Sequence, residues 1–144
     1  MAVEFNNFDP LSHVLTIAGI PVYGFSTGTM INAERNTDTF SLIQGARGDG
    51  TRVRSRDRSG KITFNIMAAC SCNDLLSARM ALDELLGTGY GALLIKDVAG
   101  STIVQAANAW LVRPANLGID TDPTPREWTI EAHVMKMHIG GSLI

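Results

Sequence analysis

The sequence contains few of the residues from which catalytic and metal sites are built. Among its 144 residues are three histidines, His13, His133 and His138, and two cysteines, Cys70 and Cys72. His133 and His138 are five residues apart, which places them on opposite faces of one strand and argues against a shared metal ion. The chain has no nucleophile elbow, phosphate-binding loop, H-E-x-x-H segment or dinucleotide fingerprint. We therefore expect no enzyme, no cofactor and no metal site.

Charge and long apolar runs are also scarce. Only 18% of the residues are charged and the formal net charge is −2, which argues against a charged disordered tail and a generally basic nucleic-acid binder. We expect neither a secretory signal nor insertion into a membrane. The lone Cys70-x-Cys72 pair matches neither a disulfide framework nor a zinc site, so two free thiols in a reducing compartment are expected. The length predicts a single domain over residues 1–144.

One segment, residues 71–87, has a clear helical pattern. Its apolar residues recur at spacings of three and four and predict one buried stripe: Leu75, Ala78, Leu82 and Leu85, joined by Leu76 and Leu86. Ser71 and Asp74 match a capping box at the start, and Gly87 matches a C-terminal stop. A helix with one apolar side must pack against a sheet, which the flanking segments have to supply.

The flanking segments predict about eight strands separated by turns rich in glycine and proline. Within the strand expected over 101–113, the small residues 106–109 indicate a bulge or a close approach of another backbone. Residues 116–125 are predicted to form a loop, and residues 126–138 one final strand.

Basic residues are concentrated between Arg47 and Lys61, where six of the twelve in the chain lie against two acids. The glycine-rich segment 44–50 is predicted to be a loop. Segments 51–56 and 61–67 flank a turn at 57–60 and predict a β-hairpin. In this register one face is solvated and basic, with Arg52, Arg54, Arg56, Lys61, Thr63 and Asn65; the core face has Val53, Ser55, Ile62, Phe64 and Ile66.

A row of arginines on one strand face can bind phosphates, but no aromatic residue is interleaved in it for base stacking. In an otherwise acidic chain, the row is better suited to docking onto an acidic surface of a second copy. Head-to-tail contacts of that kind do not close and therefore build a filament. Residues 1–11 are expected to form an extended arm, and Phe5 and Phe8 would bury in a neighbouring subunit if the parent core has no room.

Four segments occur in an order that resembles tail tube proteins of contractile-tailed bacteriophages. They are residues 33–40 (AERNTDTF), 45–50 (GARGDG), 58–63 (RSGKIT) and 70–76 (CSCNDLL). The family patterns that they match are R-x-x-D-x-F, a glycine loop, G-x-I-T and S-x-N-x-x-L. The resemblance covers most of residues 12–138.

This resemblance implies a mainly β (α+β) fold, similar to the type VI secretion tube protein, in which two antiparallel sheets form a β-sandwich or barrel with one flanking helix. It also implies homohexameric rings that stack into a hollow inner tube, through which viral double-stranded DNA passes into the host without sequence-specific binding. The implied partners are the tail sheath, baseplate and tape-measure proteins. The implied location is the virion tail, after assembly in the bacterial cytoplasm.

By the same resemblance, segment 44–60 projects toward the next ring, while the arm 1–11 and the tail 139–144 contact neighbouring subunits. The expected ring-stacking residues are Arg47, Asp49, Arg52, Arg54, Arg56, Asp57 and Arg58. The expected inter-subunit arm residues are Phe5, Phe8, Leu143 and Ile144. Because a lumen for DNA is expected to be acidic, we predict that the arginine face lies in the ring-to-ring contact. Its expected acidic partners are Asp120, Asp122, Glu127 and Glu131.

Two alternatives remain open from the sequence. One is a type VI-like tube or another tube-like tail component. The other belongs to a different class, a small β-barrel that binds nucleic acid through the arginine-rich hairpin.

Overall fold

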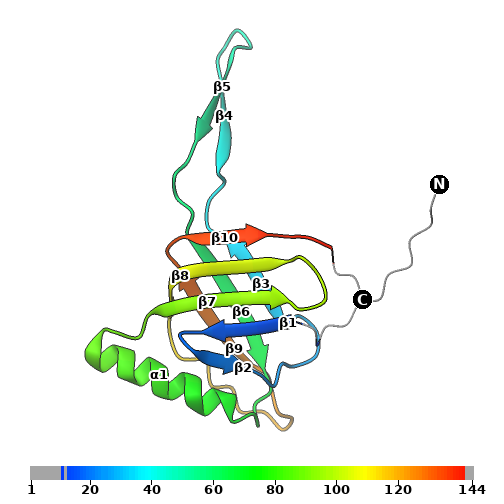
Figure 1. Cartoon of the computed structure of the whole chain (residues 1–144), viewed down its shortest axis with the longest axis vertical. Coiled ribbons are helices and arrows are strands. Elements are labelled where there is room, and N and C mark those ends of the chain that lie inside the picture. Colours follow the sequence, from blue (N-terminus) through cyan, green and yellow to red (C-terminus); the bar gives the residue numbers. More distant parts are fainter. Residues whose placement is uncertain (1–10, 12, 142–144) are drawn as a thin grey trace, which may run out of the picture.

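The computed structural model describes residue 11 and residues 13–141. That part of the chain contains ten strands and one helix (Figure 1). In order they are β1 (His13–Ile17), β2 (Ile20–Val22), β3 (Ile31–Arg35), β4 (Phe40–Gln44), β5 (Gly50–Arg54), β6 (Gly60–Ile66), α1 (Cys72–Leu86), β7 (Gly91–Asp97), β8 (Ile103–Leu111), β9 (Arg126–Ala132) and β10 (Met135–His138).

The body of the molecule is an antiparallel sheet bent into two layers. The strand order is β2-β1-β7-β8-β9-β6-β3, and β10 also pairs with β8. In Figure 1 the strands β1, β2, β7, β8 and β10 cross over β3, β6 and β9. Strands β4 and β5 form a separate two-stranded sheet. The predicted sandwich-like, mainly β fold with one helix is confirmed.

Strand β8 belongs to both layers because it is bulged in the middle. Gly91 of β7 pairs with Ala109 and Leu93 pairs with Ala106, so one residue of β7 lies opposite two of β8. Before this bulge β8 pairs with β10, and after it β8 pairs with β9. On the β7 side a glycine is needed here, because a Cβ at Gly91 would lie 2.9 Å from the Cα of Ala18. The bulge predicted at 106–109 is therefore confirmed, and it turns the sheet from one layer to the other.

The core lies between the two layers and is built from alternate residues of the strands. Ile62, Phe64 and Ile66 of β6 face Trp128 and Ile130 of β9 and are almost completely buried. The opposite layer contributes its own buried residues: Leu15, Ile17, Leu93, Ile95, Val104, Leu111 and Met135.

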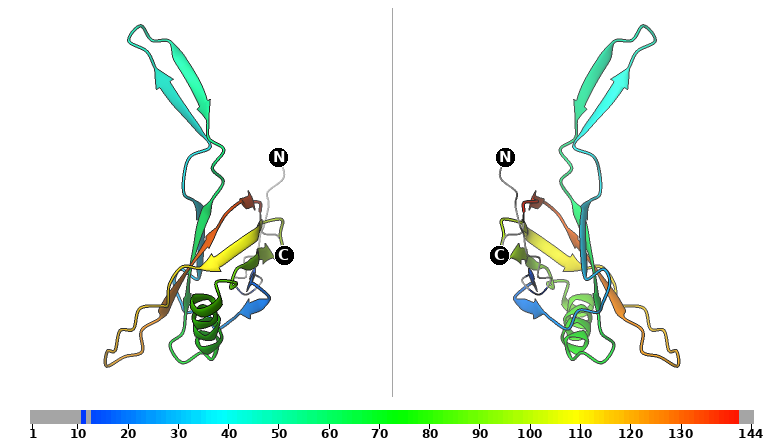
Figure 2. Two further views of the ribbon diagram at one scale, coloured as in Figure 1. Left: turned by 90° about the vertical axis from the view of Figure 1, so that its left-hand side faces the viewer. Right: turned by 90° about the vertical axis from the view of Figure 1, so that its right-hand side faces the viewer.

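Helix α1 closes the open side of the wedge between the layers (Figure 2). Its buried stripe is Cys72, Leu76 and Met80, spaced at four residues. Of the predicted stripe, only Leu76 is confirmed as buried. Its other members are exposed, Leu85 by 80%: Leu75, Ala78, Leu82, Leu85 and Leu86. The helix thus has two apolar stripes on different faces. The rest of the molecule covers the stripe of Cys72, Leu76 and Met80.

The two ends of α1 were predicted correctly, but the chemistry at the start was not. Gly87 has a φ of 69° and donates its N–H to the Asp83 carbonyl, as a C-terminal stop should. Ser71 makes no side-chain capping bond, and its hydroxyl instead pairs with that of Tyr23 at 2.8 Å. Asn73 ties this end to the preceding turn by donating to the carbonyls of Met67 and Cys70, while its Oδ1 accepts from Trp128 Nε1 at 3.0 Å.

Two strand predictions also require correction. Strand β5 pairs with β4 rather than with β6, and β6 lies in the body between β3 and β9. Burial of Ile62, Phe64 and Ile66 decides this pairing, because an isolated hairpin offers those side chains no core. The last strand is interrupted after Ala132, so that Met135 of β10 enters the core and Val134 is exposed.

Candidate assembly interface

Strands β4 and β5 form an arm that projects well beyond the body (Figures 1 and 2). Phe40 pairs with Arg54, Leu42 with Arg52 and Gln44 with Gly50. All ten strand residues are exposed, including Leu42 at 66% and Ile43 at 62%. A two-stranded ribbon is marginal in water unless something covers it. An exposed apolar ribbon of this kind is typical of a surface that a partner covers.

The two faces of the arm differ in chemistry. Residues that are paired across an antiparallel ribbon share a face, so Phe40, Leu42, Arg52 and Arg54 lie together. The Arg52 guanidinium stacks over the Phe40 ring, with Cζ 3.6 Å from the ring centroid. The opposite face is neutral and has Ser41, Ile43, Thr51 and Val53. We refer to the first set as the basic face of the arm.

The described residues do not neutralise the charge of the arm. In the part of the chain that the structure describes, no ion pair involves Arg47, Arg52, Arg54, Arg56 or Arg58; the ion pair found there joins His13 Nε2 to Asp97 Oδ2 at 3.8 Å. All five arginines are exposed. A partner that supplies carboxylates is therefore the electrostatic complement of the arm.

The neck, which consists of segments 36–39 and 55–59, joins the arm to the body and is held by several hydrogen bonds. Arg35 Nη2 donates to the Met135 carbonyl at 3.0 Å, and the Met135 N–H donates to the Arg58 carbonyl at 2.9 Å. Asn36 bonds to Ser59 through both its backbone N–H and its side chain. The backbone N–H of Ser59, 2.9 Å from Asp57 Oδ1, lowers the pKa of Asp57, and the Ser59 hydroxyl adds to the effect. These contacts orient the base of the arm on the body.

The structure distributes the predicted ring-stacking residues along the arm. Arg47 and Asp49 lie in the turn at its tip, where the Gly45 N–H donates to the Asp49 carbonyl at 2.7 Å. Arg52 and Arg54 are in β5, and Arg56, Asp57 and Arg58 are in the neck. The projecting strands are thus residues 40–44 and 50–54, joined to the body by segments 36–39 and 55–59. The expected projection over 44–60 therefore lacks nearly all of β4 and the segment 36–39 before it.

The sequence prediction missed Phe40 and Leu42 as members of this surface. It gave the segment 39–43 no partner in the arm, because the segment 51–56 was paired with the apolar segment that follows it. The available signal was the five-residue glycine-rich turn 45–49 between two short β-type runs, a common hairpin connection.

The predicted acidic partners lie apart from the basic face. Asp120 and Asp122 are exposed in the loop 112–125 between β8 and β9, at the end of the molecule opposite the arm (Figure 2). Glu127 follows at the start of β9. Glu131 is near the other end of β9, beside Lys61 of β6 and close to the neck. Three of the four acids therefore lie at the end of the molecule opposite the arm, where the arm of a second copy could reach them.

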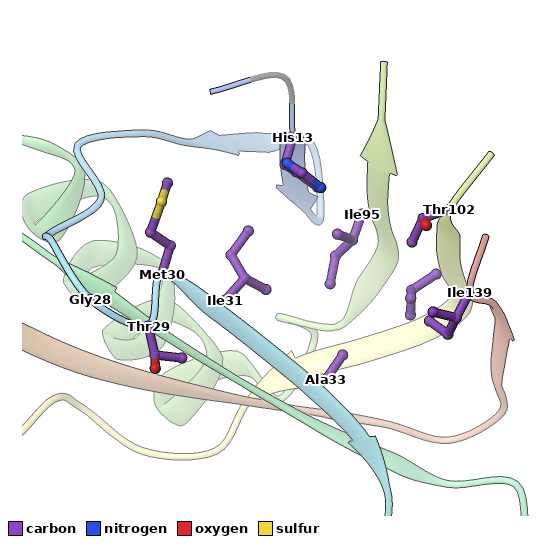
Figure 3. Close-up of a pocket in the computed structure, with 10 residues that line it drawn as sticks. His13, Gly28, Thr29, Met30, Ile31, Ala33, Ile95, Thr102 and Ile139 are labelled. Atoms are coloured by element: carbon purple, nitrogen blue, oxygen red, sulfur yellow. The ribbon is translucent and has the colours of Figure 1, made fainter. Parts of the chain in front are cut away.

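A groove opens between the edges of the two layers, on the body below the arm (Figure 3). It has a volume of about 370 Å³. Its lining is mainly apolar: Met30, Ile31, Ala33, Ile95, Val104 and Ile139, with His13, Gly28, Thr29 and Thr102 at the rim. The predicted arm residues Phe5, Phe8, Leu143 and Ile144 fall outside the described residues.

Two further observations concern other kinds of site. Within residue 11 and residues 13–141, no three His, Cys, Asp or Glu side chains are arranged to hold a metal ion. In the same part of the chain no helix is long and apolar enough to span a membrane. Both cysteines are free, and burial raises the pKa of Cys72.

The fold of the chain is similar to that of chains from tube assemblies of contractile injection systems. The chain matches a chain of the anti-feeding prophage cap, the tube terminating cap, with a TM-score of 0.64 and 11% identity; the match covers 96% of this chain and 94% of that one. It matches a chain of an extracellular contractile injection system in its sheath-tube complex with a TM-score of 0.62 and 13% identity, over 92% and 91% of the two chains. For the sheath/tube terminator of such a system the TM-score is 0.56 at 12% identity, over 96% and 100%.

The sequence comparison agrees with the fold. The chain is 26% identical over 134 residues to Structural protein ORF10 of Pseudomonas phage KPP10, covering 92% of this chain and 73% of that protein. No protein-family signature matches the chain. The resemblance to tail tube proteins is thus confirmed in fold, and the proteins that the chain is similar to are structural proteins rather than enzymes.

Proposed function

We propose that the chain is a structural subunit of the inner tube of a phage tail, in which rings of identical copies stack head to tail. The observation that carries this proposal is the β4–β5 arm, which projects from the body with an uncovered apolar surface and unneutralised arginines. In a monomer the apolar surface of the arm stays exposed to water. A second copy that covers it gains both apolar burial and charge neutralisation.

The positions of the charges support a head-to-tail contact. The basic face is at one end of the molecule, whereas Asp120, Asp122 and Glu127 are at the other. A contact between unlike ends is heterologous, so it repeats from ring to ring instead of closing after two copies. In the proposed stack, Arg52 and Arg54 meet these acids of a copy in the next ring, and Phe40 and Leu42 pack beneath them.

The finer assembly is proposed from the resemblance to tail tube proteins. It comprises six copies per ring, a lumen that conducts double-stranded DNA, and a place in the virion tail within a sheath. The chain of a sheath-tube complex among the similar structures supports a sheath as partner. Contacts with baseplate and tape-measure proteins are expected on the same ground.

A second candidate is a tube terminator, a single ring that caps the tube. It is favoured by two of the similar structures, which are of a tube terminating cap and of a sheath/tube terminator. In that case the arm would contact the last ring of a different tube protein. The two candidates differ in whether the purified chain forms rings that stack on themselves.

Negative-stain electron microscopy of the purified chain at low and high concentration tests both. Hollow tubes that lengthen with concentration support the tube subunit, and single rings that never stack support the terminator. Monomers at every concentration would contradict both. A titration with single-stranded DNA should then follow, because salt-dependent binding by monomers would favour the nucleic-acid-binding class.

A further inference from the structure

A small cleft lies between the start of helix α1 and the loop 112–125, at the end of the molecule opposite the arm (Figure 2). Its volume is about 190 Å³. This is enough for one apolar side chain, because a dry cavity of about 150 Å³ holds one benzene molecule. Its lining residues include Ala68, Ser77, Pro114, Ala115, Leu117 and Trp128.

Two polar side chains that line the cleft already have partners within the chain. Asn73 makes three hydrogen bonds, one of them with Trp128 Nε1. Arg126 Nη1 donates to the Gly118 carbonyl at 3.1 Å. An apolar occupant would therefore leave neither of these groups unpaired.

The loop beside the cleft exposes apolar side chains at a fixed position. Leu117 is 74% exposed and Ile119 is 84% exposed. The Gly118 carbonyl between them accepts from Thr124 Oγ1 at 3.3 Å and from Arg126, which ties the loop to its own far end and to β9. Leu117, a lining residue of the cleft, is thus available to a partner that enters it.

The charges around the cleft complement those of the arm. On α1 and the loop beside it, four acids lie against two basic residues: Asp74, Asp120, Asp122 and Glu127 against Arg113 and Arg126. Residues 40–58 of the arm and neck contain five arginines against two aspartates. A contact between these two ends brings unlike charges together.

Leu42 is the residue of the arm that is best placed to enter the cleft. It lies in the middle of β4, is 66% exposed and pairs with Arg52, so it belongs to the basic face. Phe40 is closer to the neck, and the Arg52 guanidinium already stacks over its ring. Leu42 therefore combines an uncovered apolar side chain with arginines on the same face.

We propose that Leu42 of one copy inserts into the cleft of a copy in the next ring, where it packs against Leu117. Arg52 and Arg54 meet the acids of α1 and the loop around it. This inference rests on the proposed head-to-tail stack and names the site that receives the arm. Burial of two leucines strengthens a contact in which exposed ion pairs alone would contribute little.

Cysteine cross-linking of the full chain tests the proposal. Cys70→Ser removes one native thiol, and Cys72 stays in place because it is fully buried. Leu42→Cys is then combined with Ser77→Cys, which lies in the cleft. Mild oxidation at high protein concentration should give a ladder of two, three and more linked chains, because the two positions lie at opposite ends of one molecule.

The matched control combines Leu42→Cys with Thr88→Cys, an exposed small polar residue just beyond the other end of α1. It should link at least tenfold less. Tubes that are visible by electron microscopy but link no more than the control would overturn the site and leave the tube assembly standing. Unlinked single rings would overturn it too and favour the terminator, and unlinked monomers would contradict both the site and the assembly.

Filling the cleft provides a second measurement in the chain with its native cysteines. Ser77→Phe places a ring in the space that Leu42 would enter, so the concentration at which stacks form should rise at least tenfold while single rings persist. Thr88→Phe adds the same ring outside the cleft and should leave stacking unchanged. Equal stacking of the two variants would contradict the assignment of the cleft.

Discussion

Reversing the charge of Arg54 is the sharpest test of the proposed stacking contact. Arg54 is exposed in β5, lies on the basic face opposite Phe40, and makes no ion pair in the part of the chain that the structure describes. Replacing it by glutamate removes an attraction to the acids of the next ring and adds a repulsion. It leaves the body of the subunit untouched, so the free energy of unfolding should change by no more than about 0.5 kcal/mol.

The expected effect on stacking follows from where the charge lies. An exposed ion pair contributes about 0.2–1 kcal/mol, whereas a pair near a protein surface at 4 Å has a Coulomb energy of about 4 kcal/mol. A partly covered contact falls between these limits, and reversal both removes the attraction and introduces repulsion. We therefore expect a loss of about 1.5–3 kcal/mol per contact. Because 1.4 kcal/mol is a factor of ten, each contact should weaken about 10- to 100-fold. The contacts between two proposed rings are repeated around the ring, so the concentration at which stacks form should rise by at least this factor.

The assay is sedimentation of stacks over a concentration series, with electron microscopy of each fraction. Arg54→Glu should leave single rings and remove long tubes. Lys96→Glu is the matched control, since Lys96 is exposed on β7 and the change in net charge is the same. High salt should weaken stacking of the native chain, because the screening length falls from about 10 Å at 0.1 M to about 3 Å at 1 M. Stacking of Arg54→Glu at the native concentration, or equal loss in the Lys96 variant, would refute the assignment of the arm.

Three further predictions concern the body. Leu76→Ala should lower the free energy of unfolding by about 2–5 kcal/mol in chemical denaturation, because Leu76 is fully buried, whereas Leu75→Ala should cost under about 1 kcal/mol; equal costs would restore the stripe predicted from the sequence. Asn73→Ala should cost about 2–3 kcal/mol in the same measurement, because it removes two bonds at the helix start and leaves the indole N–H of Trp128 unpaired; an unchanged tryptophan emission spectrum would contradict this. At pH 8, a thiol reagent should modify Cys70 at least tenfold faster than Cys72, whose pKa is raised by burial; equal rates, measured by mass spectrometry, would show that Cys72 is accessible.

Features that depend on the chemistry of a few adjacent residues were predicted correctly. The helix ends at Gly87 because only a residue that tolerates positive φ fits there. Residues 45–49 form a turn because their glycines permit it, with Gly48 at a φ of 92°. The bulge in β8 follows from the run of small residues at 106–109. The arginines and acids named from the sequence as contact residues stay predictions, which the charge-reversal experiment tests.

The two wrong predictions, the buried stripe of α1 and the partner of β5, depend on contacts between distant parts of the chain. Both the solvated and the buried stripe of α1 are apolar, so helical periodicity could not tell which one the sheet would cover. Strand β5 had two neighbours in sequence with which it could form a hairpin, at 40–44 and at 60–66. The second was taken into the body because Phe64 and its neighbours pack between β3 and β9, contacts with residues far away in the chain.

The sequence by itself therefore determined the positions of the turns, the helix and most strands, and it placed a concentration of positive charge in one segment. These properties are local, since they depend on backbone preferences and on the spacing of apolar residues over one or two turns. Only the tertiary structure decided that the arginine strand leaves the body, that Phe40 and Leu42 join it, and that three of the four predicted acids lie at the opposite end. Such choices depend on which alternative buries more apolar surface against distant segments, and that competition is settled only when the whole chain packs.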